Sequence, residues 1–148
     1  MSKRLNFLVL TLVFGAISPG ALWAKGNIAI DVKTVLASQE SEYLDPSLSS
    51  LTKELQSIFR YSSYRLLSED HVGLTMKETG TVFLPGNRVL KMTPMQVVED
   101  RIELKLVILK KKKEIFQSII KLLNHRSLTV GGPKYQDGVL LFNISASF

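Results

Sequence analysis

Apolar and polar residues alternate along most of the chain that follows residue 60. The clearest case is residues 101–110, where Ile102, Leu104, Leu106 and Ile108 alternate with Arg101, Glu103 and Lys105. A two-residue period places successive side chains on opposite faces of a strand. The pattern therefore predicts an antiparallel strand with one buried face and one exposed face.

The same criterion predicts strands elsewhere, with turns between them. β-Branched and aromatic residues alternate with polar ones over residues 27–38, 61–67, 81–84, 88–98, 127–130 and 140–148. Pro85-Gly86-Asn87 predicts a tight hairpin connection, and Glu99-Asp100 predicts a second turn. Residues 92–98, 101–110 and 114–123 are then expected to form a three-stranded meander. Residues 114–123 also fit a helical stripe, and their β-rich surroundings favour a strand.

One segment has a helical period instead. Asp45-Pro46 supplies an N-cap followed by proline at the first helical position, where the missing N–H is not needed. Five apolar residues then recur at helical spacing: Leu48, Leu51, Leu55, Ile58 and Phe59. This stripe predicts an amphipathic helix over residues 46–59 that buries one side against a sheet.

These elements define the expected fold class. It is α+β, with one amphipathic helix packed on a mainly antiparallel β-sheet or flattened sandwich of about seven to eight strands. The sequence contains no internal repeat, low-complexity tract or linker. Residues 25–148 are therefore expected to form a single domain, which at this size can bury a core of its own.

The N-terminal residues have a composition unlike the rest. Lys3 and Arg4 precede an apolar run at residues 5–17, and Pro19-Gly20 and a small residue, Ala24, follow it. This order is typical of a secretory signal peptide over residues 1–24, and the alternative is an uncleaved N-terminal anchor. We expect a periplasmic or secreted protein, with no transmembrane span once the signal is cleaved.

The absence of cysteine excludes several kinds of covalent bond and metal site. With no cysteine in the sequence, disulfides, thiolate metal sites and a lipid anchor on an N-terminal cysteine are excluded. Stability is then expected to come from the apolar core alone.

Basic residues are in modest excess, and four of them are consecutive. The net charge is +6, and cleavage after Ala24 would leave 17 basic against 13 acidic residues. The consecutive residues are Lys110, Lys111, Lys112 and Lys113. A run of this kind is typical of a solvated turn, or of a contact with anionic lipid, polysaccharide or an acidic partner. Nucleic acid is not an expected partner of an exported protein.

One cluster of side chains suggests ligand binding. Arg60, Tyr61, Tyr64 and Arg65 lie close together in the sequence. Aromatic rings stack on sugars, and arginine binds carboxylates through paired hydrogen bonds. These residues could present an aromatic and basic ligand face, although packing in the core is the more common role for such tyrosines.

The remaining polar groups do not form a catalytic pattern. His71 and His125 lack the spacing of metal ligands, and Glu69-Asp70-His71 is expected to be a bend between strands. Gly131-Gly132-Pro133 leads into a strand, whereas a phosphate-binding loop leads into a helix. We therefore assign no catalytic residue, metal or cofactor, and expect a protein that is not an enzyme.

Several segments together resemble a known group of proteins. They are Phe59-Arg60-Tyr61-Ser62-Ser63-Tyr64-Arg65-Leu66-Leu67, Gly80-Thr81-Val82, Leu84-Pro85-Gly86, Val130-Gly131-Gly132-Pro133 and Gly138-Val139-Leu140-Leu141. The chain resembles small exported β-rich proteins of Gram-negative bacteria, a group with no assigned activity. The resemblance implies an envelope location and carries no catalytic residues with it.

Two shorter resemblances keep alternatives open. Residues 129–145 are similar to the glycine pairs and hairpins of secretin channels, and residues 140–148 resemble the C-terminal insertion signal of outer-membrane proteins. Our leading hypothesis is a periplasmic, non-enzymatic binding or assembly domain that contacts an envelope protein through a sheet face or an edge strand. The alternatives are a ligand carrier or enzyme using residues 60–65, a secretion-system accessory, and a small outer-membrane protein.

Overall fold

The computed structural model describes residues 28–148, a mostly β chain with one α-helix. The predicted signal peptide lies outside the described residues. The strands are β1 (Ile28–Ser38), β2 (Tyr43–Leu44), β3 (Ser63–Leu74), β4 (Gly80–Leu84), β5 (Arg88–Val98), β6 (Arg101–Lys110), β7 (Lys113–Leu123), β8 (Arg126–Tyr135) and β9 (Gly138–Ser147). A 3₁₀ turn, η1 (Pro46–Leu48), precedes the helix α1 (Thr52–Ile58).

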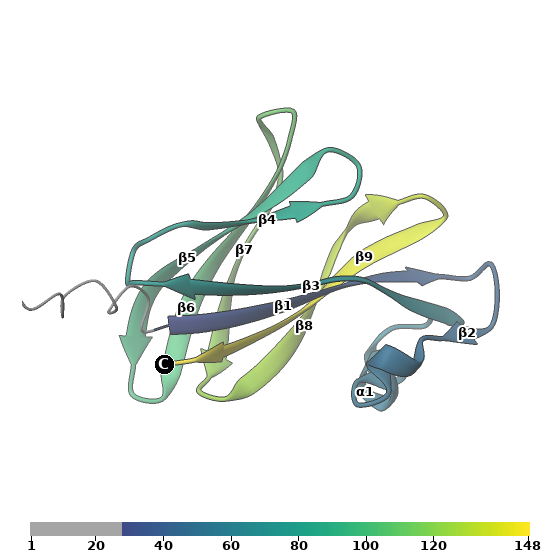
Figure 1. Ribbon diagram of the computed structural model, residues 1–148, viewed down its shortest axis with the longest axis horizontal. Helices are drawn as coiled ribbons and strands as arrows, with labels where there is room; N and C mark the ends of the chain where they lie inside the picture. The colour runs from purple at the N-terminus through teal and green to yellow at the C-terminus, as the bar shows by residue number, and fades with distance from the viewer. Residues whose placement is uncertain (1–27) are drawn as a thin grey trace, which may run out of the picture.

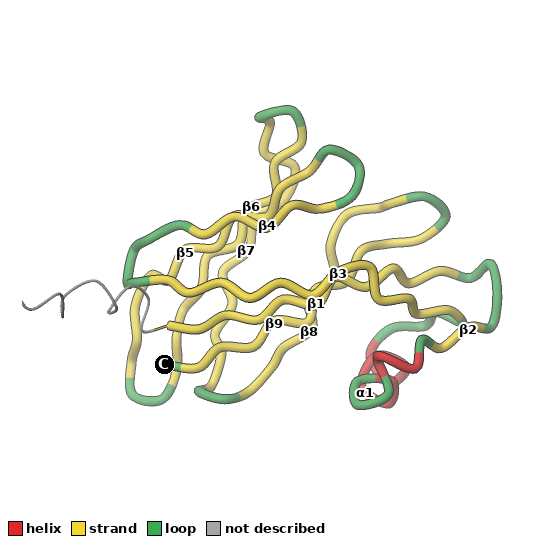
Figure 2. The backbone as a smooth tube through the Cα atoms, viewed as in Figure 1, coloured by secondary structure: helices red, strands yellow, loops and turns green. Residues whose placement is uncertain are grey.

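The nine strands form two sheets rather than one. A five-stranded sheet has the order β2-β3-β1-β9-β8, and a four-stranded sheet has the order β4-β5-β6-β7. All pairings are antiparallel except the short parallel contact between β2 and β3. Figures 1 and 2 show the sheets stacked near the C-terminus and diverging toward the β4–β5 and β8–β9 turns. The prediction of a β-rich α+β fold is confirmed, and the count of about seven to eight strands was too low.

The main core lies between the two sheets. It contains the four apolar residues of the alternating segment 101–110. These are Ile102, Leu104, Leu106 and Ile108, and all four are buried. Ile30 and Val32 of β1 and Phe142 and Ile144 of β9 cover these residues from the other sheet. Sheet-on-sheet burial of this kind supplies most of the favourable free energy of a β-sandwich.

A second core lies on the opposite face of the five-stranded sheet, under the helix. Its buried members are Val35, Ala37, Leu48, Leu51, Leu55, Tyr64 and Leu141. The sequence analysis expected the helix to cover the apolar face of the sheet. In the structure the second sheet covers the larger apolar face, and the helix covers only one end of the other face (Figure 1).

A β-bulge in β3 makes this double-sided burial possible. Thr34 of β1 pairs with Ser68, but the next residue, Val35, pairs with Leu66, so that Leu67 is the extra residue. An extra residue shifts the alternation by one, and side chains after it change face. Val72 and Leu74 therefore pack between the sheets, whereas Tyr64 and Leu66 pack toward the helix.

The predicted start of the helical segment is confirmed. The Asp45 carboxylate accepts hydrogen bonds from the Ser47 amide (3.0 Å) and the Ser47 hydroxyl (2.6 Å). Its second oxygen accepts the Leu66 amide of β3 at 3.0 Å. These bonds lower the pKa of Asp45, with the Ser47 hydroxyl contributing most. Asp45 thus caps the turn and attaches it to the five-stranded sheet.

The helix is shorter and less amphipathic than predicted. Residues 46–59 divide into η1 and α1, and Ile58, expected in the buried stripe, is 57% exposed. Phe59 takes an extended conformation that ends the helix, and its ring packs against the second core. Ile58 is the last residue of the helix and stays exposed. The following residue, Phe59, packs against the second core in its place.

Three other expectations concern strands and turns. Residues 114–123 form a strand, as predicted, within β7. His71 and its neighbours lie inside β3, so the predicted bend at residues 69–71 is wrong. The strand predicted at residues 127–130 is longer than expected, because β8 runs on to Tyr135 with a register shift between Gly131 and Lys134 that accommodates Pro133.

Candidate functional site

The outward faces of the two sheets differ in character. On the five-stranded sheet the exposed part carries the cross-strand pairs Asp31–His71 and Lys33–Glu69, which are polar on both strands. On the four-stranded sheet the outward face carries the exposed apolar residues Phe83, Ile119 and Leu123 beside charged residues such as Arg101 and Lys121. Apolar surface left exposed in a globular protein marks a contact site more often than polar surface does.

The edge strand β7 carries two of these apolar side chains, Ile119 and Leu123. It is the last strand of its sheet and runs for 11 residues. Ile119 is 57% exposed, and Ile115 and Leu123 are also exposed. Within residues 28–148, no strand is paired to the outer side of β7. A long edge without proline offers unpaired backbone groups to an incoming strand.

At the opposite end of this face, apolar and basic side chains lie together. Phe83, Val89 and Leu109 are consecutive cross-strand partners on β4, β5 and β6. Beside this row is a cleft of about 290 Å³. Its lining residues are Asn87, Val89, Lys91, Leu109, Lys111 and Lys112. Phe83 is 80% exposed, which makes it the most exposed of the large apolar residues in the described part of the chain.

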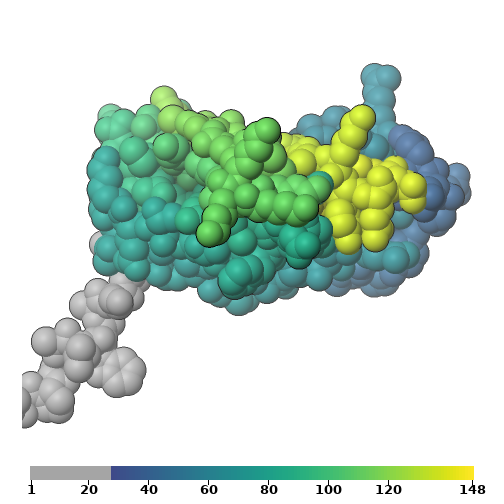
Figure 3. Space-filling view, turned by 90° about the horizontal axis from the view of Figure 1, so that it is seen from above, coloured from purple at the N-terminus to yellow at the C-terminus, as the bar shows by residue number. Residues whose placement is uncertain are grey.

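The predicted lysine run lies at this end of the molecule. Lys110 ends β6, Lys113 begins β7, and Lys111 and Lys112 form the turn between them with positive φ. Figure 3 shows the green β6–β7 segment extending outward when the molecule is seen from above. The expectation of an exposed turn is confirmed, whereas the contact with an anionic partner stays a prediction.

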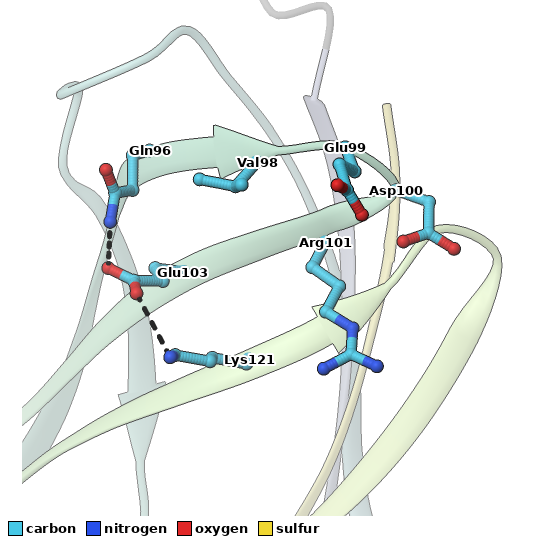
Figure 4. A pocket seen from close by; sticks show the side chains of 7 residues that line it. All are labelled: Gln96, Val98, Glu99, Asp100, Arg101, Glu103 and Lys121. Carbon is cyan, nitrogen blue, oxygen red and sulfur yellow. Dashed lines mark hydrogen bonds and ion pairs between the residues drawn. The ribbon is translucent and has the colours of Figure 1, made fainter.

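A cleft near the β5–β6 turn is lined by side chains of both charges. It has a volume of about 480 Å³ and includes Glu103. The Glu103 carboxylate accepts a hydrogen bond from Gln96 Nε2 (2.8 Å) and lies 3.5 Å from Lys121 Nζ (Figure 4). Glu99 and Asp100 form the turn itself, and Arg101 begins β6. This mixed-sign surface has no nucleophile paired with a base, the arrangement that covalent catalysis requires.

The four residues of the predicted ligand face point in different directions. Tyr64 is 1% exposed, and its hydroxyl donates to the Phe59 carbonyl at 2.7 Å, 3.2 Å from the Leu55 carbonyl. Burial raises the pKa of Tyr64. Arg65, one position further along β3, is exposed on the other face and lies 5.3 Å from the Tyr43 ring centre. Tyr64 therefore acts as a structural residue here.

Tyr61 packs against the second core, whereas Arg60 does not belong to it. Tyr61 lines a cleft of about 330 Å³ with Lys134 and Asp137, among others. Arg60 is exposed, and its backbone carbonyl accepts a hydrogen bond from the Gln39 side chain. Near this cleft, a side-chain hydrogen bond to the Asp137 carboxylate and the negative charge of that group raise the pKa of Glu40. Ligand binding at residues 60–65 stays a prediction, and Tyr61 is the predicted residue that lines this cleft.

Several polar side chains are directed between the sheets, where the sheets diverge. Thr34, Ser68 and Asp70 face the interior from β1 and β3, and each has a buried oxygen without a hydrogen-bond partner in the described chain. Arg88 of β5 has two buried nitrogens without a hydrogen-bond partner in the described chain. Its guanidinium lies 6.0 Å from the Tyr135 ring centre. Within residues 28–148, no group of three His, Asp or Glu side chains could hold a metal ion.

Comparisons with known proteins add no identification. No protein-family model, curated protein or solved structure matches this chain. In the described residues, no helix has the length and hydrophobicity needed to cross a membrane.

The sequence analysis missed the apolar members of this face, although the sequence contains a signal for them. Residues 82–84 and 119–120 are consecutive apolar residues, which break the strict alternation of a strand with one solvent-facing side. In such a pair one side chain must face outward, and in the structure Phe83 and Ile119 do so.

Proposed function

We propose that this protein is a non-enzymatic binding or assembly domain, exported to the periplasm, that contacts a protein partner of the cell envelope. The contact surface that we assign is the β7 edge together with the outward face of the four-stranded sheet. The observation that carries the proposal is the unpaired edge of β7 with Ile119 exposed at its centre. An extended segment of the partner would pair with the edge and pack on the apolar side chains.

The contrast with the other sheet supports this choice. The outward face of the five-stranded sheet is covered by the helix at one end and carries charged pairs at the other. Water solvates these charged pairs well, and burying them in an interface would require their desolvation. On the β7 edge the apolar side chains of Ile119 and Leu123 lie on either side of Lys121, and a partner gains free energy by covering these two side chains.

The test is site-specific photo-cross-linking in cells that export the protein. A photoreactive residue at position 123 is expected to give one discrete adduct with an envelope protein. The substitution Ile119→Lys should abolish this adduct, because a charge directed outward on an edge strand opposes pairing. Ile58→Lys is the matched control, since Ile58 on α1 is also 57% exposed.

Both variants should keep the thermal stability of the unsubstituted chain, which checks that they fold. An adduct that forms equally in the Ile119→Lys and Ile58→Lys variants would contradict the assignment of the β7 edge. No adduct at position 123 would contradict the contact itself.

A further inference from the structure

The end of the four-stranded sheet that carries the lysine run has a second feature, an apolar row beside the charges. Phe83 pairs with Val89, and Val89 pairs with Leu109, so their side chains form one row across three strands. We call this row, together with Lys91 and the lysines at 110–113, the basic tip. Figure 2 shows the β4–β5 and β6–β7 turns at the same end of the sheet.

The exposure of Phe83 has no structural explanation in the described chain. Its neighbours in β4, Val82 and Leu84, fill the main core, and Phe83 is directed away from that core. An aromatic ring 80% exposed to water is unfavourable unless something covers it. The cleft beside it is apolar at its base, where Val89 and Leu109 lie.

The charged side chains that line the cleft beside this row are all basic. Three of the six residues that line the cleft are Lys91, Lys111 and Lys112, and none is acidic. Lys110 and Lys113 flank the same turn, and Glu114, opposite Leu109 in the register, is the acidic group nearest to them in the sequence. A partner of this tip must therefore combine negative charge with an apolar layer beneath it.

We propose that the basic tip docks on the surface of a membrane that contains anionic lipid. The lysines would contact headgroup phosphates, and Phe83 would insert at the boundary between headgroups and acyl chains. A cleft of about 290 Å³ is small for a drug-sized ligand, which favours shallow contact with a lipid over enclosure of a soluble molecule. The β7 edge near Ile119 is outside this contact, so the proposal does not depend on the proposed protein partner.

The test is sedimentation with vesicles, using the protein recovered after export. Vesicles contain either phosphatidylcholine alone or phosphatidylcholine with phosphatidylglycerol. The variant K91Q/K111Q/K112Q is expected to bind the anionic vesicles about a hundredfold more weakly, since each lysine at the surface contributes roughly a fivefold factor. Phe83→Ser should weaken binding about tenfold through its lost apolar contact.

The matched control is K53Q/K77Q/K134Q, which removes the same charge from exposed positions outside the basic tip. It should weaken binding far less. Equal loss in the two triple variants would overturn the proposal, because attraction would then depend on net charge alone. Equal binding to both kinds of vesicle, or no binding to either, would also overturn it.

The remaining possible outcome is that the basic tip binds a soluble anion and not a membrane. If inorganic phosphate binds the protein in a way that needs Lys91, Lys111 and Lys112, and the vesicles do not bind, the tip is a site for soluble anions and the membrane proposal is wrong. Photo-cross-linking at position 123 is measured separately, so failure of the vesicle test and failure of the partner proposal can be distinguished.

Discussion

The ion pair between His71 and Asp31 joins two neighbouring strands, β3 and β1, on the exposed face of the five-stranded sheet. The hydrogen bond that the His71 ring donates to the Asp31 carboxylate is the main cause that raises the pKa of His71, and Glu69 and Asp70 act in the same direction. The imidazolium is therefore favoured in the folded chain over the unfolded chain, where the usual pKa of about 6.5 applies.

This pair predicts a small pH dependence of stability. A group whose pKa is higher in the folded state than in the unfolded state stabilises the folded chain. This stabilisation is complete at a pH below the unfolded pKa, and it is lost as the pH rises through the folded pKa. His71→Asn is thus expected to lower the melting temperature at about pH 5.5 and to leave it almost unchanged at about pH 9. Thermal unfolding at both pH values measures this. His125→Asn, on a turn with no resolved ion pair, is the control, and an equal loss at both pH values would contradict the prediction.

At the scale of elements, Tyr64 holds the helix to the sheet. Its hydroxyl bonds to the Phe59 carbonyl just after α1 and lies near the Leu55 carbonyl. Carbonyls at a helix C-terminus lack partners within the helix, and this hydroxyl supplies one from β3. The Thr129 hydroxyl adds a second link by donating to Glu54 at 3.1 Å.

Removing the Tyr64 hydroxyl should therefore destabilise the chain. Tyr64→Phe is expected to lower the free energy of unfolding by about 1–2 kcal/mol, because the partly buried Phe59 carbonyl loses the hydrogen bond from this hydroxyl. Tyr61→Phe is the matched control and should change it by less than about 0.5 kcal/mol. Denaturant unfolding measures both. If Tyr64→Phe were neutral in unfolding and instead weakened binding of a ligand, Tyr64 would belong to a site and not to the core.

At the scale of the whole molecule, the chain has two cores on opposite faces of one sheet. Leu106 lies in the core between the sheets and Leu55 in the core beneath the helix, and both are fully buried. The strands β1, β3 and β9 contribute to both cores, so they connect the two layers mechanically. The helix, in contrast, contributes to the second core alone.

The two cores should respond differently to equivalent cavities. Leu106→Ala and Leu55→Ala are each expected to lower the free energy of unfolding by about 2–5 kcal/mol. Hydrogen exchange should separate them, because Leu55→Ala opens residues 46–62 locally while β5 and β6 remain protected. Leu106→Ala should speed exchange across both sheets. Equal acceleration across both sheets in the Leu55→Ala variant would show that the helix layer is not a separate unit.

The candidate surfaces were only partly predictable. The lysine run at 110–113 was recognised from the sequence, and its exposed turn is confirmed. Phe83 and Ile119 were not recognised, because an apolar residue in a strand is normally assigned to the core. Tyr64 was given a ligand-binding role from its neighbours in sequence, but its burial depends on a bulge three residues further along.

The sequence by itself determined most of the strands, most of the turns and the capped start of the helical segment, because these depend on side-chain period and on the conformations of nearby residues. Only the tertiary structure decided that the strands form two sheets, that Leu67 shifts the faces of β3, and that the helix covers the smaller apolar face. The physical reason is that a two-residue period shows that a face is buried but does not show what covers it. That choice rests on contacts between segments far apart in the chain.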